Sequence, residues 1–306
     1  MYDTIIIGGG PCGLTAAIYL ARASKKVLLV EKEVFGGQIT KSHQVENYPG
    51  FKEISGLNLA KLMKEQVDSL GVESKYGFVK EIKKLENTFE VSVGSQVFES
   101  KTVVCATGTS PRKMNIPGEE LFTGRGVSYC ATCDGAFFKD KVVAVVGGGN
   151  TAVTDALYLA NFCQKVYLIH RRDVLRAEPI QVELLKKKSN VEFLLNATVE
   201  EINGENTVES ITLKQQEKTS QLHVDGIFIA IGSDPNTRLL DKLMPLNVNG
   251  YPTLNHQLET AISGLFVAGD VREKTVRQLV TATSDAAIAA HYINDYLEKY
   301  WNFTKL

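Results

Sequence analysis

The 306-residue sequence lacks the features that mark several large classes of protein. No apolar run approaches the roughly 20 residues of a membrane-spanning helix. The net charge is -1, so no excess of positive charge favours a nucleic acid as partner. The first seven residues contain an acid and too short an apolar stretch for a secretory leader. We therefore expect a cytoplasmic protein that binds neither membranes nor nucleic acid.

Cysteine is also scarce, and the odd number of five does not suggest a framework of structural disulfides. Only Cys130 and Cys133 have a meaningful spacing, C-x-x-C. A zinc site would need a second Cys or His pair at comparable spacing, and the sequence has none, so we predict no metal site. The spacing favours a redox-active pair, because it places two sulfurs where a disulfide can open and close. Chance spacing is the remaining alternative.

Asp134 directly follows the second of these cysteines. An acid in this place could shuttle a proton while the disulfide is reduced. The alternative is a simple turn residue, since Asp-Gly is a common turn sequence.

An internal repeat organises the chain, because residues 5–31 and 144–170 resemble each other. Both segments begin with an apolar strand and three glycines, and both later contain Tyr-Leu-Ala. Each predicts a strand, a glycine turn, an amphipathic helix and a second strand. Two such βαβ units indicate two dinucleotide-binding domains.

The rest of the sequence fits one domain inserted into the other. We predict a helix at about 56–70 and a long last helix from about 276 to 297, which returns to complete the first domain. Stretches with Pro and Gly near 111–120 and 241–252 look like crossings between the domains. The predicted fold is α/β with two Rossmann-like domains, an FAD-binding domain of residues 1–113 and 245–306 and an inserted NADPH-binding domain of residues 114–244.

The first glycine loop, Gly8 to Gly13, satisfies G-x-G-x-x-G between a strand and a helix. Gly8 permits the tight turn, Gly10 lets the backbone approach a pyrophosphate, and Gly13 lets helix and strand pack closely. Glu31 ends the second strand, where an acid bonds ribose hydroxyls. This copy predicts an FAD site, against the alternative of a structural turn without a ligand.

The second loop, Gly147-Gly148-Gly149, has a different strand end. His170 replaces the acid and is followed by three basic residues, Arg171, Arg172 and Arg176. Guanidinium groups suit a ribose 2′-phosphate, which they bind in a bidentate fork. This copy therefore predicts an NADPH site, against the alternative of a solvated basic turn.

Taken together, these motifs strongly resemble the bacterial-type, low-molecular-weight thioredoxin reductases. The resemblance runs from residue 4 to about 290. It is carried by GGGPCG (8–13), GGQIT (36–40), VENYPG (45–50), ATG (106–108), GRGVSYCATCDG (124–135), VVGGGNTAV (145–153), HRRDVLRAE (170–178) and VAGD (267–270).

The resemblance implies further site residues, a partner and a quaternary structure. FAD would also be lined by Pro11, Gly36, Gly37, Gln38, Asn47, Gly108, Gly269, Asp270, Arg277, Gln278 and Leu279. NADPH would be bound by Gly149, Asn150, Thr151 and the three arginines. Cys133 would face the flavin and Cys130 would meet the partner, a thioredoxin or a related small redoxin. The family works as a homodimer, and its inserted domain rotates.

The sequence thus predicts an NADPH-dependent thioredoxin-disulfide reductase. Hydride would pass from NADPH to FAD, then to the Cys130–Cys133 disulfide, and the dithiol would exchange with oxidised thioredoxin. One alternative is a reductase of the same scaffold with another redoxin or a peroxiredoxin as partner. Another is an oxygen-using dithiol oxidase, which the arginines oppose. A flavin-binding sensor is opposed by the retained cysteines and Asp134.

The sequence departs from the family at Val276, Ser284 and Ala286, near the start of the last helix.

Overall fold

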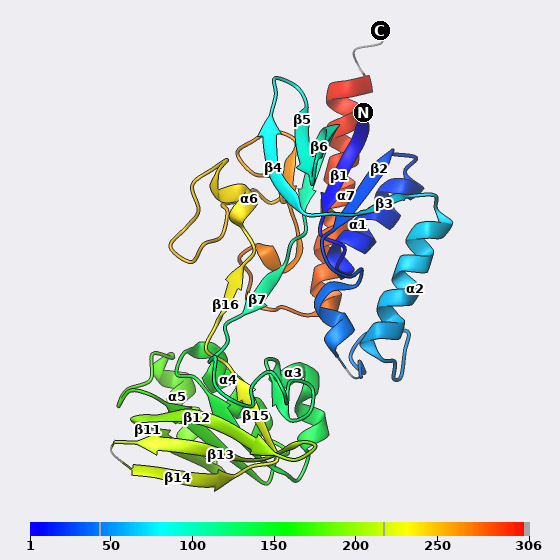
Figure 1. Ribbon diagram of the computed structural model, residues 1–306. Coiled ribbons are helices and arrows are strands. Elements are labelled where there is room, and N and C mark those ends of the chain that lie inside the picture. Colours follow the sequence, from blue (N-terminus) through cyan, green and yellow to red (C-terminus); the bar gives the residue numbers. More distant parts are fainter. Residues whose placement is uncertain (43, 217, 303–306) are drawn as a thin grey trace. The chain divides into compact units, whose positions relative to one another are not determined.

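The chain folds into two compact units in the computed structural model, which describes residues 1–42, 44–216 and 218–302 (Figure 1). Unit 1 comprises Met1–Ser110 and Asp234–Leu306, and unit 2 comprises Pro111–Ser233. The chain leaves unit 1 once and returns once, so unit 2 is an insertion. Each unit contains one copy of the internal repeat.

Unit 1 is built around a seven-stranded sheet with the order β3-β2-β1-β6-β5-β4, and β17 also pairs with β6. β1, β2, β3, β6 and β17 run parallel, whereas β4 and β5 form an antiparallel extension. The elements are β1 (Tyr2–Ile7), α1 (Pro11–Arg22), β2 (Val27–Glu31), η1 (Gly37–Lys41), α2 (Gly56–Ser69), β3 (Glu73–Tyr76), β4 (Val79–Lys84), β5 (Phe89–Val93), β6 (Gln96–Cys105), α6 (Arg238–Asp241), β17 (Leu265–Val267), η3 (Gly269–Val271), α7 (Leu279–Leu297) and the π-helical η4 (Glu298–Asn302).

The two faces of this sheet have separate cores. Helices α1, α2 and α7 bury apolar side chains such as Leu14, Leu59 and Ile293 on one face. The other face packs β4 and β5 against the first strands, with Phe89 fully buried, and Leu240 of α6 joins this cluster. The strands are apolar on both sides because both faces are covered.

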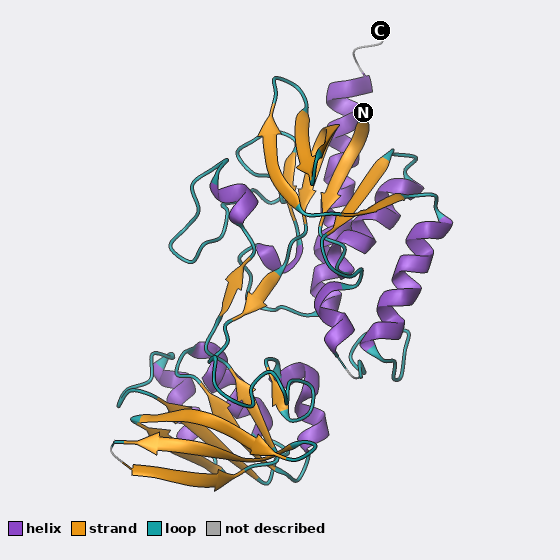
Figure 2. Cartoon of the chain, viewed as in Figure 1, coloured by secondary structure: helices purple, strands orange, loops and turns teal. Residues whose placement is uncertain are grey.

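Unit 2 has a five-stranded parallel sheet, β11-β10-β9-β15-β8, and a separate antiparallel sheet, β12-β13-β14 (Figure 2). Helices cover one face of the parallel sheet, and the antiparallel sheet covers the other. The elements are β8 (Val127–Ser128), α3 (Ala131–Asp134), η2 (Gly135–Phe138), β9 (Val142–Val146), α4 (Asn150–Leu159), β10 (Lys165–His170), α5 (Pro179–Lys186), β11 (Val191–Leu195), β12 (Ala197–Gly204), β13 (Val208–Gln215), β14 (Lys218–His223) and β15 (Gly226–Ile229).

Two short strands, β7 (Thr109–Pro111) and β16 (Ser233–Pro235), pair where the chain crosses between the units. The return crossing lies earlier than the predicted boundary at 244/245. Residues 234–244 belong to unit 1. This segment includes α6, whose Leu240 is 1% exposed and packs into the unit 1 core. The sequence around 241–252 contains turn residues, but it forms a loop within unit 1 and is not the crossing between the units.

The βαβ repeats and the two expected helices are confirmed. β1–α1–β2 and β9–α4–β10 have the same parallel pairing. α2 begins where the Ser55 hydroxyl accepts a hydrogen bond from the Asn58 amide. α7 begins three residues later than predicted, because Gln278 caps it in a reciprocal capping box with Thr281.

Candidate functional site

The first glycine loop joins β1 to α1 and has two tightly packed glycines and one open glycine. Gly8 has φ +108°, and a Cβ there would lie 2.4 Å from the Ala106 carbonyl oxygen. A Cβ on Gly13 would lie 1.8 Å from the Gly8 carbonyl oxygen. At Gly10 a Cβ would meet nothing within 4 Å. Gly8 and Gly13 therefore shape the turn, whereas Gly10 leaves backbone accessible just before Pro11 at the α1 N-terminus.

The Glu31 carboxylate lies against this loop at the end of β2. It accepts hydrogen bonds from the Gly9 amide at 2.6 Å and from the Glu33 amide at 2.8 Å. The residue is 8% exposed. Each carboxylate oxygen retains acceptor capacity beyond its backbone bond, so the group can still receive hydroxyl donors.

Gly36 and Gly37 bring a second segment to the same loop. The Gly36 amide donates to the Gly9 carbonyl at 2.7 Å. A Cβ on Gly37, whose φ is +55°, would lie 3.1 Å from the Gly10 Cα. Gln38 follows within η1, so its backbone also belongs to this part of unit 1.

The ends of β6 and β17 complete the edge of the sheet beside the first loop. Gly108 follows β6 with φ +66° and open space around a would-be Cβ. Gly269 follows β17 with φ +81°, and its Cβ would lie 3.0 Å from the Cys12 Cβ. β1, β6 and β17 are parallel neighbours, and the chain order reverses between β1 and β6. Ligands of open α/β sheets bind at such switch points, beyond the carboxyl ends of the strands.

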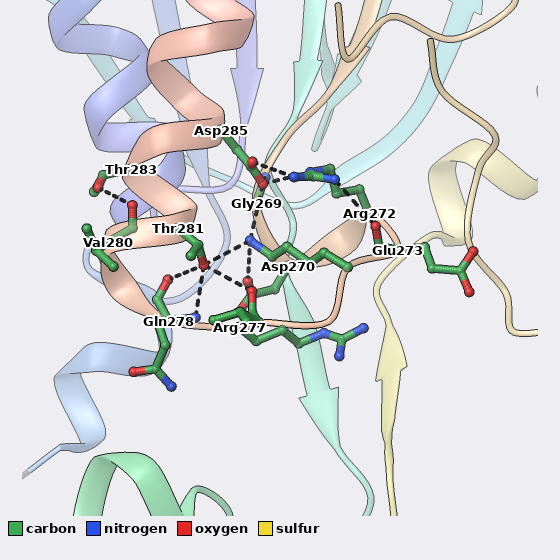
Figure 3. Close-up of polar contacts among 12 residues, drawn as sticks. Gly269, Asp270, Arg272, Glu273, Arg277, Gln278, Val280, Thr281, Thr283 and Asp285 are labelled. Atoms are coloured by element: carbon green, nitrogen blue, oxygen red, sulfur yellow. Dashed lines mark hydrogen bonds and ion pairs between the residues drawn. The ribbon is translucent and has the colours of Figure 1, made fainter. Parts of the chain in front are cut away.

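The segment before α7 supplies the remaining predicted residues of unit 1 (Figure 3). Asn47 donates to the Gln278 amide oxygen at 3.2 Å, and Leu279 begins α7. Arg277 Nη2 donates to the Tyr251 hydroxyl at 2.7 Å. Within the described residues, Arg277 Nε is buried without a hydrogen-bond partner. A buried donor of this kind fits an anionic or carbonyl-rich ligand.

The second glycine loop repeats the first in unit 2. A Cβ on Gly147 would lie 2.4 Å from the Ala230 carbonyl oxygen, and one on Gly148 would lie 2.3 Å from the His170 ring. A Cβ on Gly149, which precedes α4, would meet nothing within 4 Å. This loop therefore also leaves one backbone position open at a helix N-terminus, where Asn150 and Thr151 begin α4.

Three arginines lie in the segment that follows β10 and contacts this loop. The Arg176 amide donates to the Gly148 carbonyl at 2.6 Å, which folds the segment after β10 over the glycines. Arg171, Arg172 and Arg176 are exposed, and no carboxylate among the described residues forms an ion pair with them. Burial, and then the charges of Arg176 and Arg172, lower the pKa of His170. Three guanidinium groups without carboxylate partners fit a phosphate ligand.

Cys130 and Cys133 form a disulfide that begins directly after β8. β8 lies beside β15, and β15 lies beside β9, all parallel. The disulfide and the second glycine loop therefore occupy the same carboxyl edge of one sheet. Cys133 is exposed and Cys130 is half-buried. Their sulfurs are bonded to each other, and the described residues contain no cluster of three His, Cys, Asp or Glu that could hold a metal ion.

Asp134 closes the short helix that carries the disulfide. Its carboxylate accepts a hydrogen bond from the Ser128 hydroxyl at 2.6 Å, and the same hydroxyl accepts from the Cys130 amide at 3.1 Å. Burial raises the pKa of the Asp134 carboxyl, although the Ser128 hydrogen bond acts in the opposite direction. An acid that stays protonated to higher pH can supply a proton to a neighbouring thiolate.

Sequence reasoning did not identify Ser128, Tyr129 or Glu119 as parts of this site. Tyr129 donates to the Glu119 carboxylate at 2.8 Å, and the same carboxylate accepts from the Met114 and Asn115 amides. Glu119 is 2% exposed. The strand that leads to Cys130 is thus tied to the segment that enters unit 2. The one available signal was the position of Ser128 and Tyr129 directly before the first cysteine.

Comparison with known proteins gives a consistent result. Residues 2–286 match the family model described as pyridine nucleotide-disulphide oxidoreductase. The thioredoxin reductase of Bacillus subtilis (strain 168) is 44% identical over 302 residues, which cover 98% of this chain and 96% of that protein. The solved thioredoxin reductase of Streptococcus pyogenes MGAS5005 is 40% identical with a TM-score of 0.93, covering 98% of this chain and 99% of that one. That of Lactococcus lactis in the FR conformation is also 40% identical, covering 98% and 100%, with a TM-score of 0.69.

Alanine at the open glycine of each loop separates the two cofactor assignments. Gly10 and Gly149 have φ of -71° and -96° and free space for a Cβ, so both variants should fold. We expect Gly10→Ala to weaken FAD binding and Gly149→Ala to weaken NADPH binding, each by about 10-fold or more, because a methyl group would occupy the pyrophosphate approach. Flavin absorbance of the purified protein and NADPH titration measure the two effects. Loss of FAD in Gly149→Ala alone would reverse the assignment.

Proposed function

Because the chain belongs to the pyridine nucleotide-disulphide oxidoreductase family, and within it to the low-molecular-weight thioredoxin reductases, we propose that it reduces oxidised thioredoxin with electrons from NADPH. Thioredoxin reductases of this family contain FAD and use NADPH. The observation that carries the proposal is the Cys130–Cys133 disulfide at the same sheet edge as the arginine-flanked glycine loop.

The chemistry that FAD supplies when bound is the transfer of reducing equivalents, which arrive as a hydride from NADPH and leave as an electron pair to the disulfide. The chain would hold FAD in unit 1, with Gly8, Gly10, Gly13 and Glu31 at the first loop and the predicted residues of η1, β6, β17 and α7 around it. In unit 2, Gly149, Asn150 and Thr151 would face the NADPH pyrophosphate, and the three arginines its 2′-phosphate.

The two cysteines and Asp134 would pass the electrons on to the partner. Reduction of the Cys130–Cys133 bond adds two electrons and leaves two sulfur atoms, each as thiol or thiolate. Asp134 would supply one proton, and its raised pKa favours the protonated form from which it can donate. We assign Cys130 to the attack on the partner disulfide and Cys133 to the flavin side. This assignment rests on the family resemblance.

The proposal extends to the assembly, the location and the partner of the enzyme. We propose a homodimer that acts in the cytoplasm on a thioredoxin or a related small redoxin. No helix in the described part of the chain is long and apolar enough to cross a bilayer. The same scaffold could serve a different redoxin or a peroxiredoxin, and an oxygen-using dithiol oxidase would need no arginine cluster.

The central experiment follows NADPH oxidation in the presence of thioredoxin and a disulfide reporter. We expect Cys133→Ser to abolish this turnover, because no disulfide can form, while reduction of bound flavin by NADPH continues. Cys163→Ser is the matched control in the same unit: Cys163 is buried, its sulfur donates to the Phe138 carbonyl, and a hydroxyl can keep that bond. Thioredoxin turnover that survived Cys133→Ser would contradict the relay.

Removal of an arginine should change the choice of nucleotide. We expect Arg172→Ala or Arg176→Ala to raise the KM for NADPH by roughly 10- to 100-fold, the effect of losing a charged hydrogen bond, and to leave the KM for NADH nearly unchanged. Steady-state kinetics with both nucleotides measure this. Arg22→Ala, an exposed arginine at the end of α1, is the control. An equal change for both nucleotides would overturn the 2′-phosphate assignment.

Substitution of Asp134 should alter both the rate and its pH dependence. Loss of a general acid lowers the rate by about 10²- to 10⁴-fold, and we expect Asp134→Asn to lower thioredoxin turnover within that range. In the wild type we expect activity to fall as pH rises through the Asp134 pKa, and in Asp134→Asn this fall should disappear. In Ser128→Ala the hydrogen bond that lowers this pKa is lost, so the fall should move to higher pH.

The same pKa predicts a change in stability with a definite sign. Because burial raises the folded-state pKa, the contribution of Asp134 is fully present below the ordinary aspartate pKa of about 3.9 and is lost as pH rises through the folded-state value. Asn cannot ionise, so Asp134→Asn should gain unfolding free energy relative to the wild type as pH rises. Denaturant unfolding at pH 4 and pH 8 measures the difference, and a pH-independent difference would contradict the burial argument.

A further inference from the structure

A group of four charged side chains lies between the end of β17 and the second turn of α7 (Figure 3). At its centre is Asp285 of α7, which is 3% exposed. One carboxylate oxygen accepts from Arg272 Nη2 at 2.7 Å. The other accepts from Arg272 Nε at 2.8 Å, Lys274 Nζ at 3.1 Å and the Gly269 amide at 3.1 Å. Lys274 also pairs with Asp270 at 2.9 Å.

This group contains two cations and two carboxylates, so its charges balance. Balanced charges alone do not show that the group stabilises the folded protein. The Lys274 and Asp285 side chains are only 7% and 4% exposed, so all their charge has been taken out of water. Desolvation offsets most of the attraction in buried ion pairs, and apolar replacements are often as stable. The arginine and lysine nevertheless outweigh burial and keep the pKa of Asp285 below its usual range. The better-attested use of such groups is to fix one arrangement of the backbone.

The backbone that Asp285 fixes is the turn of Gly269 and Asp270. The Asp285 carboxylate binds the Gly269 amide directly, and it binds Asp270 through Lys274. Besides the bonds within helices and strands, the backbone hydrogen bonds at this turn in the described structure are Arg272 to Gly269 and Ala268 to Cys105. The side-chain network adds the bond to the Gly269 amide and the ion pair with Asp270.

This turn also borders the first glycine loop. A Cβ on Gly269 would lie 3.0 Å from the Cys12 Cβ at the start of α1. Asp285 thus connects three parts of the proposed FAD site in unit 1: the end of β17, the segment before α7, and α7 itself. All of its hydrogen bonds are made to groups of the protein itself.

We propose that Asp285 is a positioning residue for FAD, which holds the Gly269–Asp270 turn in its binding form through Arg272, Lys274 and the Gly269 amide. The inference rests on the proposed function, because it takes unit 1 as the FAD site. Asp285 itself need not touch the cofactor. Binding energy that would otherwise be spent on ordering the turn is then available for FAD affinity.

The test measures FAD affinity directly, on the full chain freed of flavin and titrated with FAD by fluorescence. We expect Asp285→Asn to weaken FAD binding by roughly 10- to 100-fold, because it removes the charge that holds two cations and the Gly269 amide. Asp295→Asn is the matched control, since Asp295 lies on the same helix in an exposed pair with His291. NADPH affinity, which depends on unit 2, should not change in either variant. Equal FAD affinity in wild type and Asp285→Asn would overturn the proposal.

A double variant separates positioning from stability. In Asp285→Leu/Arg272→Met the Asp285–Arg272 pair becomes apolar and Lys274 keeps its ion pair with Asp270, so the unfolding midpoint of the apoprotein should stay near that of the wild type. We expect FAD binding to remain weak in this variant. If it recovered to the wild-type affinity, the network would serve stability alone and the proposal would fail. If the wild-type protein itself bound no FAD, the proposed function would fail instead, which keeps the two outcomes distinct.

Discussion

The structure depends on a close contact that both units repeat, between a glycine turn and the carbonyl group that follows a neighbouring parallel strand. Gly8 lies against the Ala106 carbonyl and Gly147 against the Ala230 carbonyl, and in each case a side chain would collide at 2.4 Å. Because the turn is pressed against the next strand, the following helix starts directly at the sheet edge. At the open glycine, Gly10 or Gly149, a Cβ would meet nothing within 4 Å, so a ligand can approach the backbone there. Every other feature of the proposed sites is arranged around these two edges.

The same frame carries opposite charges in the two units, and the end of the second strand decides which. In unit 1 this strand ends in Glu31, whose carboxylate binds the loop backbone and leaves acceptors for hydroxyl groups. In unit 2 it ends in His170, whose ring fills the space beside Gly148 and whose pKa is lowered by burial and by arginines. The lowered pKa disfavours the charged form of His170, and the three exposed arginines supply the basic surface. One fold can thus present an acceptor to one nucleotide and guanidinium donors to another.

Local patterns allowed the sequence to predict the elements and the two loops, because strand, turn and helix signals lie within about 30 residues of each other. The contacts that complete the sites join distant residues, and no local pattern reports them. Asp285 reaches Gly269 and Arg272 from the next helix, and Tyr251 holds Arg277 from a separate excursion of the chain. The return boundary was predicted too late for a related reason: the turn residues near 241–252 were visible, whereas the packing of Leu240 into unit 1 was not. Individual cofactor contacts remain predictions.

The placement of the disulfide has a consequence for the proposed reaction. Cys130 and Cys133 follow β8, and the second glycine loop follows β9, so the disulfide and the proposed NADPH loop of unit 2 belong to one sheet edge. The residues proposed for FAD all belong to unit 1. A single flavin must then serve the nicotinamide and the disulfide in turn, and two groups fixed to the same rigid sheet cannot both occupy one position beside it. On the proposed function, turnover requires at least two arrangements of the units. We expect the paired strands β7 and β16, where the chain crosses, to accommodate the change.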